Sequence, residues 1–175
     1  MSWGQHSIGE KVYDLKHLDP FVLTVTPKAE GAPTFRVLVT FGSHTFTREL
    51  EACDADEHRF VDGTDTRCFC ETRYSCSAAL PDIVRRASTG RVFFSEGRNM
   101  LCVEWLEGLS GPYAVFFNLS RSPQKGIHAA MFVVSAYEKP ALPERLPAMT
   151  FVTLVSNVVA NKKLVVPKDL RAIKK

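Results

Sequence analysis

The sequence lacks the short motifs by which several classes of enzyme bind nucleotides or metals. It contains no Walker loop, no glycine fingerprint for dinucleotides, no Gly-x-Ser-x-Gly elbow and no His-Glu-x-x-His pair. It also lacks a long apolar run, since the longest, AMTFVTLVSNVVA, is interrupted by Thr, Ser and Asn and is too short to cross a bilayer. These absences speak against a P-loop enzyme, an elbow-type serine hydrolase, a zincin and a membrane-spanning protein. No cofactor is expected.

Paired cysteines are missing as well. Three of the five cysteines fall within residues 67–76, RCFCETRYSC, at spacings of C-x-C and C-x₅-C. Structural zinc sites use C-x₂₋₄-C pairs and dithiol redox sites use C-x-x-C, so cysteines that pack are the favoured interpretation and no metal is expected. A zinc site that adds Cys53 and His58 stays an alternative. So does a reactive Cys76, near a helix start and close to Arg73.

The opening segment, MSWGQHSIGEKVYDLKH, has no apolar centre of the kind that secretion signals carry. We therefore expect a cytoplasmic protein, in which thiols stay reduced. The net charge is only +3 but is unevenly spread, because residues 51–65 carry six acids against one arginine and residues 161–175 carry six bases against one aspartate. One interpretation is that the acidic segment is a solvated loop and the basic segment a solvated tail. The alternative is that the basic segment, with Lys162 and Lys163, is an arm that binds RNA.

The hydrophobic pattern predicts one α+β domain over residues 1–175. Its expected parts are an N-terminal hairpin region (1–50), an acidic loop (51–66), a helix-plus-sheet core (67–138) and a C-terminal segment (148–175). Strands are predicted at 21–27 and 34–41. The Gly-Ser pair at 42–43 suits a two-residue hairpin turn, which would place His44 opposite Phe41 on the apolar face.

A helix is predicted from apolar residues spaced i, i+3, i+4 and i+7, namely Leu80, Ile83, Val84 and Ala87. Ser77 is a candidate cap, Pro81 and Asp82 suit the first turn, and Gly90 suits the end. Strand-like runs at 91–94, 99–105, 113–119 and 129–137 indicate an antiparallel meander. The expected fold is one main helix packed on a curved antiparallel sheet of about four strands, with an extra N-terminal β-hairpin. Residues 150–161 suit a helix or a strand.

Several polar residues are candidates for chemistry. Histidine suits general acid/base work near neutral pH, which singles out His44, although a structural histidine beside the turn is the alternative. Arg73 and Tyr74 precede the predicted helix, where an anion can bind. Ser135 and Tyr137 share a predicted strand face with apolar residues, and so either cap the core or line a cleft. Six arginines cluster around the helix: Arg67, Arg73, Arg85, Arg86, Arg91 and Arg98.

Side chains of these types are sufficient to cleave RNA without metal. The 2′-hydroxyl attacks its own phosphate, so the nucleophile belongs to the substrate. The protein supplies a base near the 2′-oxygen, an acid near the leaving 5′-oxygen and cations on the remaining phosphate oxygens. This chemistry needs only histidine, arginine, lysine, tyrosine and serine on a curved sheet.

The order of the predicted helix and strands resembles that of the barnase–EndoU–colicin–RelE superfamily of small ribonucleases and toxins. More narrowly, YDLKHLDPF (13–21), FGSHTF (41–46), CFCETRYSCSAALP (68–81) and SAYEKP (135–140) resemble a bacterial family linked to mobile elements and to stationary-phase growth adaptation. The resemblance implies a metal-independent endoribonuclease with a toxin or stress role. A protein inhibitor or a second copy of the chain would be its protein partner.

The resemblance assigns a role to each candidate residue. His44 would be the acid/base, Arg73 the phosphate clamp, and Tyr74, Ser135 and Tyr137 the hydrogen bonders of the site. The arginine cluster and the basic tail add the expected substrate-binding residues Arg67, Arg85, Lys162 and Lys163. A non-catalytic module that binds RNA or protein, with a structural His44, is the main alternative, and a small zinc-binding domain is the third.

Overall fold

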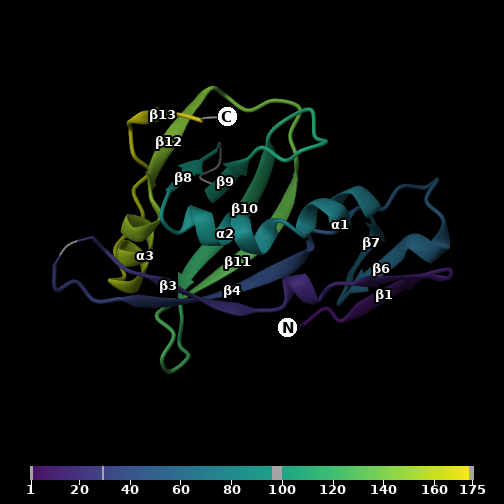
Figure 1. The fold of residues 1–175 in the computed structure, drawn as a ribbon, viewed down its shortest axis with the longest axis horizontal. Helices are drawn as coiled ribbons and strands as arrows, with labels where there is room; N and C mark the ends of the chain where they lie inside the picture. The colour runs from purple at the N-terminus through teal and green to yellow at the C-terminus, as the bar shows by residue number, and fades with distance from the viewer. Residues whose placement is uncertain (1, 29, 96–99, 174–175) are drawn as a thin grey trace.

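The computed structural model describes residues 2–28, 30–95 and 100–173. Within these residues the fold is α+β, with three α-helices, a mixed eight-stranded sheet, a three-stranded sheet and a two-stranded hairpin. The expectation of one helix on a sheet of about four strands is therefore wrong. The four-stranded meander does form, but it is the centre of a larger sheet that recruits strands from both ends of the chain (Figure 1).

The large sheet has the strand order β13-β12-β8-β9-β10-β11-β4-β3. Its strands are β3 (Phe21–Val25), β4 (Phe35–His44), β8 (Arg91–Phe94), β9 (Met100–Glu104), β10 (Tyr113–Arg121), β11 (Ala129–Glu138), β12 (Arg145–Thr150) and β13 (Leu170–Ala172). Neighbouring strands are antiparallel except β11 and β4, which run parallel. Parallel neighbours need a long connection, and the chain between β4 and β11 includes the three-stranded sheet, two helices and the start of the meander.

The smaller sheets form a lobe beside the large one (Figure 1). Their strands are β1 (Gln5–Ile8), β2 (Lys11–Asp14), β5 (Thr47–Glu49), β6 (Arg59–Asp62) and β7 (Asp65–Phe69), with short 3-10 turns at η1 (Lys16–Leu18) and η2 (Asp56–His58). β1 pairs with β2, and β7 lies between β5 and β6. The acidic segment predicted as a loop thus contains η2, β6 and the start of β7.

The hairpin predicted at residues 42–43 does not form, and β4 instead continues to His44. Both edges of β4 are already occupied, because Val39 pairs with Phe21 of β3 on one side and with Met131 of β11 on the other. The chain turns after β4, where Phe46 N donates to Ser43 O at 3.1 Å, and β5 then pairs with β7. His44 consequently lies beside Ser135 of β11 and not beside Phe41.

Three helices cover the large sheet and its junction with the lobe: α1 (Glu71–Ser77), α2 (Leu80–Ala87) and α3 (Phe151–Val159). The apolar spacing of α2 is confirmed, since its Leu80, Ile83 and Val84 are buried in the core. The predicted cap is wrong, because Ser77 ends α1 and Ala79 precedes α2 without a side-chain cap. Residues 151–159 form a helix, capped by Thr150, whose Oγ1 accepts from Thr153 N at 3.1 Å.

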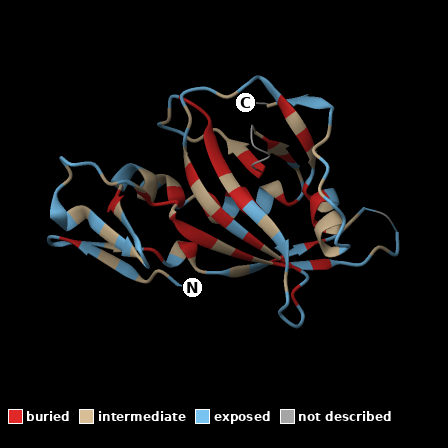
Figure 2. Ribbon diagram, turned by 180° about the vertical axis from the view of Figure 1, so that it is seen from behind, coloured by how far each residue is buried: buried red, intermediate tan, exposed pale blue. Residues whose placement is uncertain are grey.

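The core lies between the helices and one face of the large sheet, where the central strands are buried (Figure 2). Met131 and Val133 of β11 point into this core. The pairing of β11 with β10 and with β4 then shifts register before Ser135. This bulge moves Ser135 and Tyr137 to the face opposite Met131. The prediction that these two residues share a strand face with the apolar residues of β11 is therefore wrong. None of the described helices is both long and apolar enough to cross a membrane.

Candidate functional site

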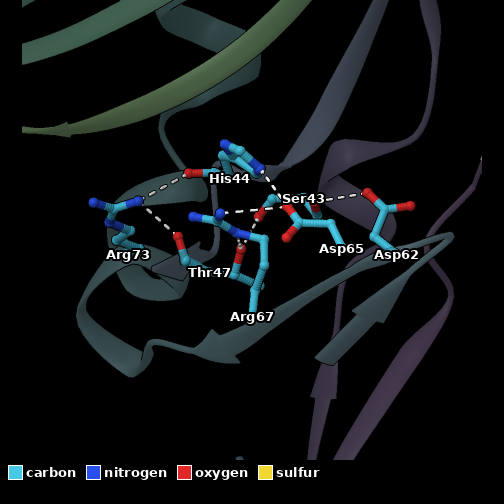
Figure 3. Close-up of polar contacts among 7 residues, drawn as sticks. All are labelled: Ser43, His44, Thr47, Asp62, Asp65, Arg67 and Arg73. Carbon is cyan, nitrogen blue, oxygen red and sulfur yellow. Dashed lines mark hydrogen bonds and ion pairs between the residues drawn. The ribbon is translucent and has the colours of Figure 1, made fainter. Parts of the chain in front are cut away.

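A cavity of about 640 Å³ lies where the large sheet meets the three-stranded sheet. Five of the residues predicted from the sequence line it: His44, Arg67, Arg73, Ser135 and Tyr137. The register of the β4–β11 pair shifts just before His44 and Ser135, and these two residues then lie side by side at the cavity. Asp65, at the start of β7, completes the polar lining (Figure 3).

His44 and Asp65 form a hydrogen-bonded pair in this cavity. Nε2 of the imidazole lies 3.1 Å from Oδ2 of the carboxylate, and the His44 side chain is 38% exposed. The hydrogen bond to His44 is the largest cause that lowers the pKa of Asp65 below its ordinary 3.8, so the carboxylate is ionised at neutral pH. The second ring nitrogen, Nδ1, has no hydrogen bond to any described residue. The imidazole is oriented by one nitrogen and keeps the other for a ligand.

The backbone that carries His44 is held by buried side chains on both sides of it. Thr45 Oγ1 donates to Gly42 O at 2.8 Å, and Thr47 Oγ1 donates to Ser43 O at 2.8 Å. Ser43 Oγ in turn donates to Asp62 of β6 at 2.7 Å (Figure 3). These bonds fix the turn after β4 against the small sheet. The position of His44 is therefore set by the fold and not by a mobile loop.

Arg73 reaches the cavity from α1. Its Nη1 donates to His44 O at 3.3 Å and to Thr47 O at 2.6 Å, and its Cζ lies 5.0 Å from the centroid of the Tyr137 ring. No carboxylate of a described residue forms an ion pair with it. Burial is the main cause that lowers the pKa of Arg73, but a guanidinium remains charged at neutral pH. Arg73 thus provides a half-buried, uncompensated positive charge beside His44.

Arg67 supplies a second guanidinium from β7. Its side chain is only 12% exposed, its Nε donates to Thr47 Oγ1 at 2.8 Å, and its Nη1 lies 3.4 Å from Asp65 Oδ2. Glu49 and Asp65 are the acids of the cavity, so its charges do not all have one sign. The set can bind an anion at Arg73 and move a proton at His44, and both operations take part in the cleavage of a phosphodiester.

Four predicted site residues lie elsewhere. Tyr74 points away from the cavity, because its hydroxyl donates to Asp14 O at 3.2 Å and its ring packs against Tyr13. Arg85 pairs with Asp82 and lies over the Phe21 ring. Lys162 and Lys163 follow α3 and are exposed, and they do not line this cavity. Sequence proximity to a helix start or to a basic tail was therefore a poor guide to these four positions.

A family model named YjaZ family matches residues 5–159, which is most of the 175-residue chain. The chain belongs to the YjaZ family. The match includes every residue that lines the cavity and ends before Lys162 and Lys163. It carries no link to the ribonuclease superfamily or to mobile elements. Comparisons with curated proteins and with solved structures gave no match.

Asp65 is one residue of this YjaZ-family site that sequence reasoning missed. It lies at the end of DGTD, in the acidic segment read as solvated, and its hydrogen-bond partner His44 is 21 residues away. Nothing local in the sequence distinguishes it from the five other acids of that segment. Thr47, which accepts from Arg67, was missed because the hairpin expected there gave it another environment.

The cysteines of the YjaZ-family chain are all free thiols. Cys68 and Cys102 are buried, and burial raises the pKa of Cys102 to about 12. Burial is also the largest cause that raises the pKa of Cys76, which lies near the end of α1 and not at a helix start, so a thiolate at this position is disfavoured. Among the described residues, His, Cys, Asp and Glu side chains form no group of three that could hold a metal ion.

Proposed function

We propose that this protein is a metal-independent endoribonuclease that cleaves RNA by general acid/base catalysis. The observation that carries the proposal is the convergence of the His44–Asp65 pair with Arg67 and Arg73 in one cavity. A proton-transfer group next to the uncompensated guanidinium of Arg73 suits a reaction in which an anionic phosphate gains charge while protons move. The nucleophile is the 2′-hydroxyl of the substrate, so the protein needs no covalent catalyst.

Each lining residue has a defined role in this proposal. His44 accepts the proton of the 2′-hydroxyl as that oxygen bonds to phosphorus; the bond to the 5′-oxygen breaks, and this oxygen takes its proton from solvent. Asp65 is a positioning residue that holds the ring by Nε2. Arg73 binds the scissile phosphate, and Arg67 adds a second cation behind it. Ser135 lies beside His44 in the β4–β11 pair and offers a hydroxyl to the phosphate oxygens, as does Tyr137 from the next position on that face.

The wider setting is part of the same proposal. A resemblance to the barnase–EndoU–colicin–RelE ribonucleases is supported by the antiparallel order β8-β9-β10-β11, which is the meander that the resemblance implies. A toxin or stress role in a mobile element, with a protein inhibitor or second copy as partner, follows from that resemblance, and a cytoplasmic location and a single folding domain are proposed beside it. The non-catalytic module that binds RNA or protein remains the second candidate, and cleavage assays separate the two.

The test is cleavage of RNA by the purified full chain in excess EDTA. We expect products with 2′,3′-cyclic phosphate ends, and a rate that falls by roughly 10²–10⁴-fold in His44→Ala. Asp65→Asn keeps the shape of the side chain but loses the charge that orients the imidazole, so its rate should fall by at least about tenfold. His58→Ala, a histidine of η2 outside this cavity, is the matched control and should cleave at the wild-type rate.

Two outcomes would contradict the proposal. Cleavage that His44→Ala leaves unchanged would mean that the activity does not come from this site. Absence of cleavage by wild-type protein, with RNA still bound, would favour the non-catalytic module. Circular dichroism of each variant distinguishes a lost reaction from a lost fold.

A further inference from the structure

Phe116 of β10 and Tyr137 of β11 form an aromatic pair beside the candidate site. Their ring centroids lie 5.6 Å apart with an angle of 26° between the planes. Both rings line a second cavity of about 610 Å³. This cavity shares Ser135 and Tyr137 with the one that contains His44. The two cavities therefore adjoin along β11, with the aromatic pair at the boundary.

Two cations accompany the aromatic pair. Nζ of Lys139 lies 5.6 Å from the centroid of Tyr137 and 5.8 Å from that of Phe116. The guanidinium carbon of Arg73 lies 5.0 Å from the Tyr137 centroid. Neither cation forms an ion pair with a carboxylate in the described part of the chain. The surface thus combines flat aromatic faces with positive charge, and an apolar ligand would leave that charge unpaired.

The ligand that matches both features is a planar ring attached to a phosphate. We propose that the Phe116–Tyr137 pair is a stacking site for one nucleobase of single-stranded RNA, next to the phosphodiester at Arg73. This proposal rests on the proposed function and specifies its substrate class. A base can stack on a protein ring only when it is free of its own neighbours, so the site selects single strands over duplexes. Asn118, two residues along β10, lines the same cavity and offers an amide to the base edge.

The test uses a short single-stranded deoxyoligonucleotide that contains one 2-aminopurine. Without a 2′-hydroxyl it cannot be cleaved by the proposed reaction, and the fluorescence of 2-aminopurine falls when the base stacks. We expect wild-type protein to bind the probe and to quench it. Phe116→Leu should weaken binding by about tenfold and remove most of the quenching, because stacking on an aromatic ring contributes on this scale. Phe116→Tyr should restore both.

Phe132→Leu is the matched control. Phe132 is a 43% exposed aromatic residue of β11 that lies outside both cavities. Its replacement should leave affinity and quenching unchanged. An abasic probe with the same number of phosphates should bind wild-type protein as weakly as the 2-aminopurine probe binds Phe116→Leu. The fluorescence of 2-aminopurine within a duplex should not fall further when protein is added, because that base is already stacked on its neighbours.

The outcomes separate this proposal from the proposed function. Loss of quenching in Phe116→Leu, with no cleavage of the matching RNA by wild-type protein, supports the stacking site and contradicts the ribonuclease. Cleavage of RNA with equal quenching and affinity in wild type and Phe116→Leu contradicts the stacking site alone. Failure of wild-type protein to bind the probe, or equal binding of the abasic probe, also overturns the stacking site.

Discussion

At the scale of single residues, His6 has an imidazole ring that packs among aromatic side chains. Its ring stacks on Phe69 with centroids 5.0 Å apart and meets the Phe60 ring at 5.2 Å. Its Nε2 is buried and has no hydrogen-bond partner among the described residues. Burial is the largest cause that lowers the pKa of His6 from 6.5, followed by the charge of His58. Folding therefore favours the neutral imidazole.

This environment predicts a loss of stability in mild acid. The unfolded chain binds a proton at His6 near pH 6.5, whereas the folded chain binds it only at lower pH. The contribution of His6 to the free energy of unfolding is therefore complete above the unfolded pKa, and it is lost as pH falls through the folded pKa. His6→Phe keeps the stacking and removes the titration. Its urea midpoint should fall less than that of wild type between pH 7.5 and pH 5.5.

The size of the His6 effect is at most about 1.4 kcal/mol for each unit of pKa difference, and partial exposure reduces it. His17 also has a pKa lowered chiefly by burial, and it is present in both proteins, so some acid sensitivity should persist in the variant. An equal fall of the urea midpoint in His6→Phe and wild type would show that His6 does not contribute.

At the scale of secondary-structure elements, the connection from β9 to β10 passes very close to the end of β11. A Cβ on Gly111 would lie 2.2 Å from the carbonyl oxygen of Lys139. Gly111 N donates to Glu138 Oε1 at 2.6 Å, and Lys139 N donates to Pro112 O at 2.8 Å. This contact requires glycine for space and positions the segment of β11 that carries Tyr137.

Gly111→Ala should therefore lower the free energy of unfolding by about 1–3 kcal/mol, because a backbone atom and not a flexible side chain must move. Gly90→Ala is the matched control, since a Cβ there meets its nearest neighbour at an ordinary 3.7 Å. Urea unfolding of both variants measures the difference. Equal stability of the two variants would mean that the β10–β11 end can separate at no cost.

At the scale of the whole molecule, an aromatic cluster joins the lobe to the large sheet. Phe46 is fully buried, and its ring contacts Trp3 at 5.3 Å and Phe60 at 5.0 Å between centroids. Trp3 Nε1 donates to Phe41 O of β4 at 3.0 Å. Phe46 belongs to the same apolar core as Val39 of the large sheet. The wall of the candidate site that carries Asp65 is therefore held to the wall that carries Ser135 through this core.

The shared core predicts that the chain unfolds in one transition. Phe46→Ala should lower its free energy of unfolding by about 3–5 kcal/mol and shift both far-ultraviolet dichroism and tryptophan fluorescence together. Phe132→Ala, at a 43% exposed position, should cost less than about 1 kcal/mol. Two separate transitions, or a change in the fluorescence of Trp3 alone, would show that the lobe folds on its own.

Much of the local structure and several site residues could be predicted from the sequence. The meander followed from runs of alternating apolar residues, and α2 followed from the spacing of Leu80, Ile83 and Val84. His44 and Arg73 were identified by side-chain chemistry, and both line the cavity. Proline disfavours strands because it lacks a backbone N–H, yet Pro147 lies within β12, which pairs with β13 and with β8.

The sequence by itself determined which segments become helices and strands at the centre of the fold, because periodicity and turn residues act between close neighbours in the chain. Tertiary structure decided which edges of β4 pair, where β11 bulges and that Asp65 meets His44. Each edge of a strand pairs with one other strand, and that strand can lie at any distance along the chain, so local sequence does not specify it. The faces of Ser135 and Tyr137, and the site they line, were therefore settled by packing.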